Sequence, residues 1–188
     1  MNVTLYGSSR SRASRALWLL RELDIPFNHI EDKASSSINP NQKIPSLTVQ
    51  ENGKKPFHLY ESLAITTYLA KKCQKFHPKT VEEAALVEMW SLWVITECEM
   101  NLLGLLMGSP QSDELKKKLV RPLTALNTEL EGKSYLIGDR FTVADLNVVS
   151  IIGAWGRKFD YSPYPNVARY LKACMARPAF SPKRSAKM

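Results

Sequence analysis

Residues 43–65 read KIPSLTVQENGKKPFHLYESLAI, and this stretch decides the fold of the first part of the chain. Its pattern predicts two short strands, Ser46 to Val49 and Phe57 to Tyr60. The turn between them contains Asn52-Gly53, the strongest short-range signal for a β-hairpin. An apolar run with helical spacing then extends from Ser62 to Lys72. The stretch therefore predicts a hairpin that is followed at once by a helix.

The residues before this hairpin predict one more strand, a helix and a weak strand. Val3 and Leu5 alternate toward one face, and Gly7 ends that strand. Apolar side chains at helical spacing follow from Ala13 to Leu23, and residues 27–30 form the weak strand. Residues 32–42 are expected to be an irregular loop. The predicted order is β-α-β-loop-β-β-α.

The second part of the chain has the pattern of an all-helical domain. Residues 74–79 have the composition of a linker. Helices are expected to open at Thr80, Ser112, Thr142 and Pro165, the first through a capping box. Pro122 should kink or interrupt the second of these helices. We therefore expect an α/β domain over residues 1–76 and an all-α domain over residues 81–188.

Length and composition limit the class of protein. A chain of 188 residues with 44% hydrophobic and 23% charged residues can fold as one or two ordinary domains, which argues against a disordered tail protein. It contains no apolar run of membrane-spanning length, and its first residues do not resemble an export signal. The three cysteines, Cys73, Cys98 and Cys174, are far apart and odd in number. A reduced, cytoplasmic protein is the expectation.

The formal charge of +8 is unevenly distributed along the chain. Residues 1–80 carry a net charge of +6, residues 81–138 carry −4, and residues 139–188 carry +6. An acidic block between two basic ones favours a basic cleft facing an acidic segment over a continuous nucleic-acid-binding stripe. A small anionic ligand would suit such a cleft.

Four short motifs in a characteristic order carry a resemblance to a known family. They are Ile44-Pro45, Glu61-Ser62-Leu63-Ala64-Ile65, Leu136-Ile137-Gly138-Asp139 and Phe141-Thr142-Val143-Ala144-Asp145. Together they resemble the cytosolic glutathione transferase superfamily. The opening Ser11-Arg12, with Leu17-Trp18-Leu19-Leu20, is similar to a serine-using branch common in bacteria and fungi. The resemblance implies a thioredoxin-like N-terminal domain, an all-helical C-terminal domain and a two-fold dimer.

The resemblance also implies where glutathione binds. The peptide bond before Pro45 should be cis, which lets the backbone of Ile44 pair with the cysteinyl residue of glutathione like an added strand. Ser62 and the helix start behind it would bind the γ-glutamyl carboxylate, and Glu61 would accept from the ammonium. The residues alone support a simpler role as well, with Ser62 as a helix cap.

Two exposed side chains could meet the other end of the tripeptide. By resemblance Lys43 would bind the glycyl carboxylate, and the alternative is a solvated surface lysine. Gln42 is a weaker candidate for the same role.

The segment from Ser8 to Arg12 should stabilise the glutathione thiolate. A free thiol has a pKa of about 8.5, and a donating hydroxyl, a helix start and a guanidinium would each lower it. Ser11 is the first candidate donor, followed by Ser9 and Ser8, and Tyr6 is the contender from other classes of the family. The alternative is that these serines only cap a helix. In the serine-using branch of the family a small polar residue is expected at the position of Arg10, so this sequence differs there.

Other notable residues have simpler interpretations. Thr142 and Asp145 form a structural capping box. Aromatic and methionine side chains of the helical part either line a pocket for an apolar acceptor or belong to the core, namely Met89, Trp90, Trp93, Met100, Met107 and Trp155. The histidines are isolated and predict neither a metal site nor a catalytic triad.

The sequence thus predicts a cytoplasmic, homodimeric glutathione transferase of detoxification type. It would join the thiolate of glutathione, its co-substrate, to small hydrophobic electrophiles without a metal, a membrane or a nucleic acid. The alternatives are a glutathione-dependent peroxidase, isomerase or dehalogenase, and a non-catalytic module of the same fold. The Ser-Ser-Cys signature of the isomerase is absent. The segment also has no cysteine, so thiol–disulfide exchange of the glutaredoxin or omega type is not expected.

Overall fold

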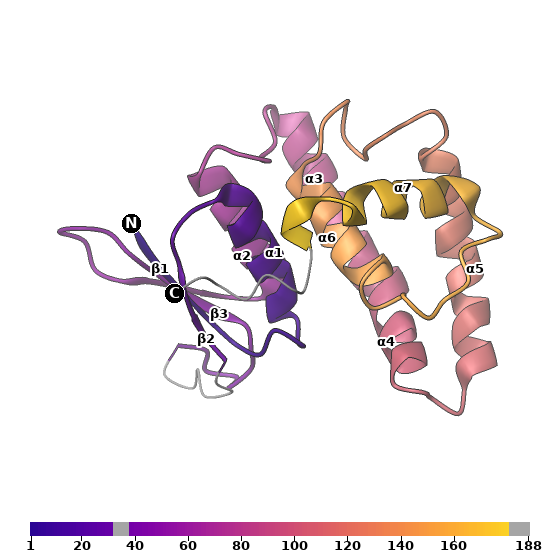
Figure 1. The fold of residues 1–188 in the computed structure, drawn as a ribbon, viewed down its shortest axis with the longest axis horizontal. Helices are drawn as coiled ribbons and strands as arrows, with labels where there is room; N and C mark the ends of the chain where they lie inside the picture. Colours follow the sequence, from indigo (N-terminus) through magenta and orange to yellow (C-terminus); the bar gives the residue numbers. More distant parts are fainter. Residues whose placement is uncertain (32–37, 181–188) are drawn as a thin grey trace. The chain divides into compact units, whose positions relative to one another are not determined.

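The computed structural model describes residues 1–31 and 38–180 and divides the chain into two compact units (Figure 1). The first unit runs from Met1 to His77, and the second begins at Pro78. Most of the expected loop at residues 32–42 lies outside the described residues.

A four-stranded mixed sheet forms the first unit. Its strands are β1 (Asn2–Tyr6), β2 (Asn28–Ile30), β3 (Ser46–Gln50) and β4 (Phe57–Tyr60), in the order β2-β1-β3-β4. β1 runs parallel to β2 and antiparallel to β3, and β3 runs antiparallel to β4. The predicted element order and the thioredoxin-like fold are confirmed.

Two helices cover one face of this sheet (Figure 1). They are α1 (Ala13–Leu23) and α2 (Ser62–Lys72), which pack against each other. Every second residue of β1 and β3 is apolar and buried, so the strand alternation supplies the other half of this core. In the chain, α1 follows β1 and α2 follows β4, so both helices begin close to the sheet.

Every regular element described in the second unit is helical. The elements are α3 (Val81–Trp93), a π-helical segment (Val94–Glu99), α4 (Met100–Leu106), α5 (Ser112–Glu129), α6 (Val143–Ile152), α7 (Pro165–Met175) and a 3-10 turn (Pro178–Phe180). All ten residues of α6 are buried, and α3 and α7 pack against it (Figure 1). The all-helical fold is confirmed for the described residues of this unit.

The predicted capping box of α6 is present and buried. The Asp145 carboxylate accepts from the backbone N–H of Thr142 at 2.8 Å, and the Thr142 hydroxyl accepts from the backbone of Ala144. Asp145 also accepts from the backbone N–H of Leu136 at 2.9 Å and from the Tyr170 hydroxyl at 3.0 Å. Burial raises the pKa of this carboxyl above its usual value. The carboxyl group thus ties the preceding loop and α7 to the start of the central helix.

Two local expectations for the helical unit need correction. α5 continues through Pro122, so the expected interruption is wrong, while the expected kink stays a prediction. Only the carbonyl four residues earlier loses its helical partner, and Lys118, at that position, is exposed. At the start of α3, the Thr80 hydroxyl accepts from the Glu83 N–H as predicted. The Glu83 carboxylate does not complete the box, however, because it binds the backbone of Lys79 and the guanidinium of Arg140.

Among the described helices, none combines the length and the hydrophobicity needed to cross a lipid bilayer.

Candidate functional site

The candidate site lies at one edge of the sheet in the first unit. Strand register aligns Tyr6 with Ser46 and with Ile30, and it aligns Ser46 with Tyr60. Because β3 runs opposite to the other three strands, the ends of β1, β2 and β4 meet the start of β3 at this edge. We call the residues gathered there the sheet-edge site, which comprises residues 6–12, 42–46 and 60–62 together with Arg15 and Glu31.

Gly7 holds two loops of this site together. It has a φ of +130°, and a Cβ atom there would lie 3.0 Å from Cβ of Ile44 and 3.2 Å from Cβ of Ala13. Its N–H donates to the Ile30 carbonyl at 2.9 Å, and its carbonyl accepts from Nε2 of His29 at 2.8 Å. Only glycine lets the loop after β1 lie so close to the loop before β3.

The loop before β3 contains the predicted cis peptide bond. The Ile44–Pro45 bond is cis, which confirms the expectation. The buried amide of Asn39 donates to the Lys43 carbonyl at 2.8 Å, and Gln42 has a φ of 54°. Pro45 is buried and Ile44 half-buried, whereas Lys43 and Gln42 are exposed. The loop therefore keeps its backbone at the sheet edge and leaves two polar side chains accessible to a ligand.

The start of α2 differs from the sequence expectation. Glu61, not Ser62, is the N-cap residue, and it has an unusual backbone conformation with φ 73° and ψ 113°. The expectation that the Ser62 hydroxyl caps the helix is wrong, because α2 has no side-chain cap hydrogen bond. Instead, the buried Ser62 hydroxyl accepts from Nη1 of Arg15 at 2.9 Å. The first N–H groups of α2 have no acceptor within the helix, so they can bind an anion.

Arg15 is a residue of the site that the sequence analysis missed. It lies in α1, and only 1% of its surface is exposed. A buried guanidinium beside the first turn of α2 adds positive charge where the helix dipole is also positive. The only signal in the sequence was a charged residue near the start of α1, just before the apolar run from Ala16 to Leu20.

The hydroxyl of Ser11 is occupied by the local backbone. It donates to the Ser8 carbonyl at 2.7 Å and accepts from the Ala13 N–H at 3.1 Å. A hydroxyl has one hydrogen, so in this conformation Ser11 has none to donate to a ligand. These bonds form the turn that leads into α1.

Ser9 and Ser8 differ in whether the hydroxyl still has a hydrogen to donate to a ligand. Ser9 bonds the Glu31 carboxylate through its backbone N–H, at 3.2 Å, and through its side chain. The side-chain bond is the largest cause of the lowered pKa of Glu31. The Ser8 hydroxyl accepts from the Arg10 N–H at 3.3 Å, and among the described residues it donates to none. Of the three, Ser8 therefore has the hydroxyl that is available to a ligand.

Tyr6 closes β1 at the same edge. Its half-buried side chain lies on the opposite sheet face from Leu5, because successive strand residues alternate. Its place beside Ser46 brings it within the sheet-edge site.

The candidate acceptor residues of the second unit divide into core and surface. Trp90 is buried and meets Trp93 edge to face, with ring centroids 5.2 Å apart. Trp155 is half-buried. The methionines are not core residues, since they are exposed together with nearby aliphatic side chains of α3, the π-helical segment and α4: Met89, Leu92, Ile95, Met100 and Met107. This apolar surface is a candidate contact for a hydrophobic molecule.

None of the cysteines is an activated nucleophile. All three are free, and burial raises the pKa of Cys98 and of Cys174 to about 12 and also raises that of Cys73. Within residues 1–31 and 38–180, no three side chains of His, Cys, Asp or Glu gather as a metal site.

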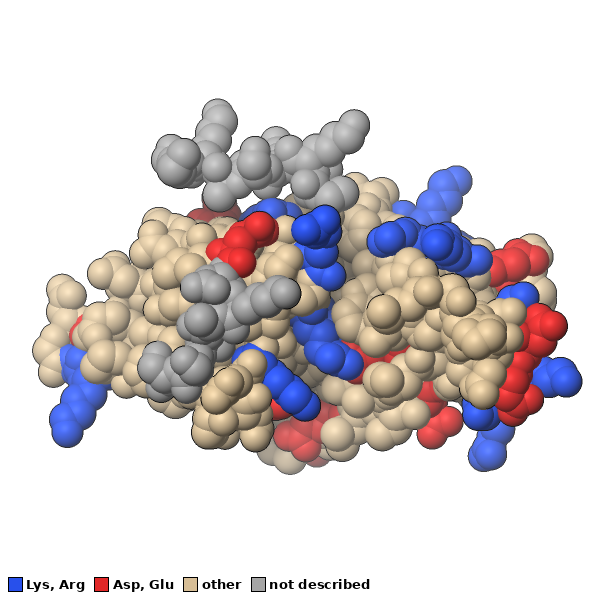
Figure 2. Space-filling model, turned by 90° about the horizontal axis from the view of Figure 1, so that it is seen from below, with Lys and Arg blue, Asp and Glu red and all other residues tan. Residues whose placement is uncertain are grey.

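Surface charge on the face shown in Figure 2 is mixed. Basic side chains lie at several separate places there, with acidic side chains among them. On α5, Lys116 pairs with Asp113 and Lys118 with Glu114.

Comparison with known proteins agrees with this geometry. The family model described as glutathione S-transferase, N-terminal domain, matches residues 5–75, and the one described as glutathione S-transferase, C-terminal domain, matches residues 95–178. The chain is 29% identical over 158 residues to the disulfide-bond oxidoreductase YfcG of Escherichia coli, which covers 76% of this chain and 71% of that protein. It is 28% identical over 192 residues to glutathione S-transferase D7 of Drosophila melanogaster, covering 91% and 83%.

A solved structure with a similar fold is that of a glutathione transferase from Burkholderia graminis with two glutathione molecules bound per subunit. The TM-score is 0.82 and the sequence identity 26%, and the match covers 98% of this chain and 90% of that one.

Proposed function

The chain belongs to the glutathione S-transferase superfamily, and we propose that it binds glutathione at the sheet-edge site and joins it through its sulfur to small, apolar electrophiles. The observation that carries this proposal is the meeting of three features at one sheet edge. These are the cis bond before Pro45, the start of α2 beside Arg15, and the loop that presents Ser8. Glutathione bound to the B. graminis enzyme supports the choice of ligand.

The glutamyl end of glutathione would bind at the start of α2. The Ser62 oxygen accepts from Arg15, so its own hydrogen can donate to the α-carboxylate. The first N–H groups of the helix add donors, and the exposed Glu61 carboxylate would accept from the ammonium.

The rest of the tripeptide would extend along the loop before β3. The N–H and C=O groups of Ile44 would pair with the cysteinyl backbone as an added strand would. Lys43 and Gln42 are exposed beyond it and would meet the glycyl carboxylate.

The thiolate would lie at the loop after β1. Ser8 is our first candidate donor, since Ser11 and Ser9 already use their hydroxyls within the protein. Tyr6 is the alternative. A donated hydrogen bond together with nearby positive charge lowers the thiol pKa, so more of the nucleophile is ionised at neutral pH.

The chemical step requires little else from the protein. The sulfur lone pair forms a C–S bond with the electrophilic carbon, and the leaving group departs with its electron pair. With 1-chloro-2,4-dinitrobenzene, the products are the thioether and chloride. Proximity and thiolate stabilisation supply most of the rate enhancement.

Calorimetry with glutathione and a conjugation assay with this electrophile test the proposal. Ser8→Ala should lower kcat/KM near pH 6.5 about tenfold, because the bound thiol loses a charge-assisted hydrogen bond. Activity should recover at alkaline pH, where the thiol ionises without help. Ser9→Ala and Tyr6→Phe are the matched controls. A larger loss in Tyr6→Phe would move the donor role to Tyr6, and the absence of any heat with glutathione would refute the proposal.

A second candidate function is a glutathione-dependent disulfide-bond oxidoreductase. The similarity to YfcG and the two glutathione molecules in the B. graminis enzyme favour it. Two glutathione thiols would reduce one disulfide, giving two thiols and glutathione disulfide, so the protein needs no reactive cysteine. A coupled assay with 2-hydroxyethyl disulfide distinguishes this activity from conjugation.

Three further properties belong to the proposal. We expect a cytoplasmic homodimer that detoxifies its substrates. Light scattering at micromolar concentration tests the dimer. Retention on immobilised glutathione without either activity would instead indicate a non-catalytic module, and activity with peroxides, halogenated compounds or isomerisable substrates would indicate one of the related enzymes.

A further inference from the structure

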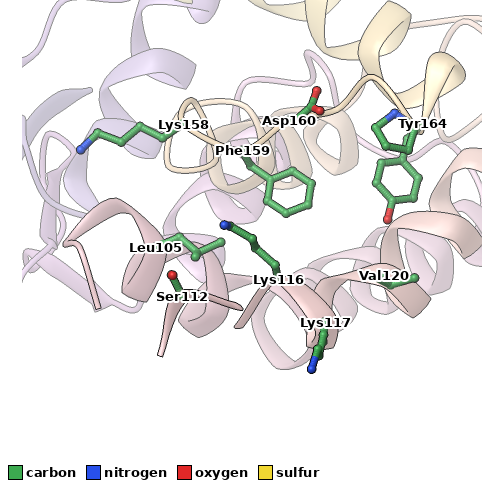
Figure 3. A pocket seen from close by; sticks show the side chains of 10 residues that line it. Leu105, Ser112, Lys116, Lys117, Val120, Lys158, Phe159, Asp160 and Tyr164 are labelled. Carbon is green, nitrogen blue, oxygen red and sulfur yellow. The ribbon is translucent and has the colours of Figure 1, made fainter. Parts of the chain in front are cut away.

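A cavity lies within the helical unit, independently of the sheet-edge site (Figure 3). Its volume is about 570 Å³. The end of α4, the first half of α5 and residues 158–164 line it. Small-molecule sites commonly measure about 300–1,000 Å³, so this cavity is large enough for a ligand with two fused rings.

The interior of the cavity is largely apolar and aromatic. The ring of Phe159 projects into it, and Leu105 and Val120 lie on either side (Figure 3). Phe159 also meets Tyr161, with ring centroids 5.0 Å apart, and stacks with Tyr164 at 6.5 Å and an interplanar angle of 27°. This aromatic cluster holds the Phe159 ring in place, so a flat ring could stack or pack edge-on against a rigid surface.

The charge around the cavity is mainly positive. Figure 3 shows the Lys116 ammonium pointing toward Phe159, whereas the ammonium groups of Lys117 and Lys158, which also line the cavity, point away from it. Lys158 is 3.4 Å from the Leu106 carbonyl, to which it donates.

The acidic side chains near the cavity already form hydrogen bonds or ion pairs within the protein. Asp160 lines the cavity, but its carboxylate points away in Figure 3 and accepts from the backbone and hydroxyl of Ser162 at 2.9 Å each. Asp113 lies 3.3 Å from Lys116, and both are well exposed, so this ion pair is weak and a ligand anion can compete with it.

We propose that the cavity binds a small aromatic carboxylate, with its ring against Phe159 and its carboxylate on Lys116. Val120 and Leu105 would cover the remaining apolar surface of the ligand. The Lys116 ammonium selects an anion over a neutral molecule of the same shape. This site requires neither glutathione nor the transferase reaction.

Naphthalene-2-carboxylate is a suitable probe, with naphthalene-2-carboxamide as its uncharged counterpart. Titration of the full chain by calorimetry and by NMR should show saturable binding of the carboxylate, at least fivefold tighter than that of the amide. Lys116→Gln should remove this preference, and Phe159→Leu should weaken the binding of both probes. Lys118→Gln is the matched control, because Lys118 lies on the same helix and pairs with Glu114 but does not line the cavity.

The outcomes that would overturn the proposal are distinct. They are no saturable binding, equal affinity for the two probes, or an equal effect of Lys116→Gln and Lys118→Gln. Displacement of the probe by glutathione would place it at the sheet-edge site instead. If Phe159→Leu does not fold, Phe159→Tyr retains the ring and should retain binding.

Discussion

Replacing Asp145 by alanine should destabilise the helical unit strongly, although the residue takes no part in the proposed chemistry. The carboxylate is fully buried and accepts four hydrogen bonds from three residues, Leu136, Thr142 and Tyr170. Alanine would leave two backbone N–H groups and the hydroxyls of Thr142 and Tyr170 without this acceptor.

The magnitude follows from these groups. Each donor left unsatisfied costs about 1–3 kcal/mol, so four of them give roughly 4–12 kcal/mol. Relief of the buried charge, which raises the pKa of Asp145, and entry of water into the space both reduce this sum. We therefore expect a loss of about 3–4 kcal/mol. At about 2–4 °C per kcal/mol for a chain of this size, Tm should fall by roughly 10 °C.

Urea unfolding followed by tryptophan fluorescence measures the loss of stability in the helical unit. Three of the four tryptophans, Trp90, Trp93 and Trp155, lie in the helical unit, so most of the signal reports its unfolding, and Trp18 in α1 reports the first unit. Tyr170→Phe removes one of the four bonds and should lower stability by about 1 kcal/mol. The combined variant should lose less than the sum of the two single variants, because they share a hydrogen bond.

Asp113→Ala is the control for a change of charge. Asp113 is exposed at the start of α5, and its replacement should alter stability little. If Asp145→Ala and Asp113→Ala have the same effect, or if Asp145→Ala costs less than about 1 kcal/mol, the assigned role of the buried carboxyl is refuted. Glutathione affinity at low temperature should be unchanged in Asp145→Ala, because the proposed site lies in the other unit.

Three further predictions test individual groups. Arg15→Met should raise the Kd for glutathione, measured by calorimetry, about tenfold, because the hydroxyl of Ser62 loses its charged donor. An unchanged Kd in a folded variant would contradict this role of Arg15. In a thiol-titration assay at pH 8, Cys98 should stay unreactive until the protein unfolds, because burial raises its pKa to about 12, whereas the partly exposed Cys73 should react first. The carboxyl of Glu51 should titrate at about 2 by NMR, because hydrogen bonds from Lys54 and Lys72 lower its pKa. Its contribution to stability is present at neutral pH and is lost as the pH falls through that value. A titration near 4 would argue against these hydrogen bonds.

Local signals account for the features that the sequence analysis predicted correctly. Asn52-Gly53 specifies a turn within a few residues, and the pattern of Thr142 and Asp145 specifies a helix start in the same way. The cis bond before Pro45 was expected because the surrounding motif resembles the family, since most bonds that precede proline are trans.

The serines show why the site was harder to predict. Ser8, Ser9 and Ser11 have the same functional group within four residues, so the sequence cannot rank them by chemistry. Their ranking depends on side-chain hydrogen bonds, including that of Ser9 with Glu31, which lies 22 residues away in the chain. These bonds favour Ser8, which the sequence analysis had placed third.

The sequence by itself determined the two-part architecture, the strands and helices, and the family, because hydrophobic periodicity and capping residues act over short distances. Only the tertiary structure decided that Arg15 reaches Ser62 across 47 residues, which hydroxyl keeps a hydrogen for a ligand, and that Lys116, which lines a cavity, points toward Phe159. The physical reason is that hydrogen bonding and burial depend on which side chains the fold brings within about 3–4 Å of each other, and neither periodicity nor composition contains that information.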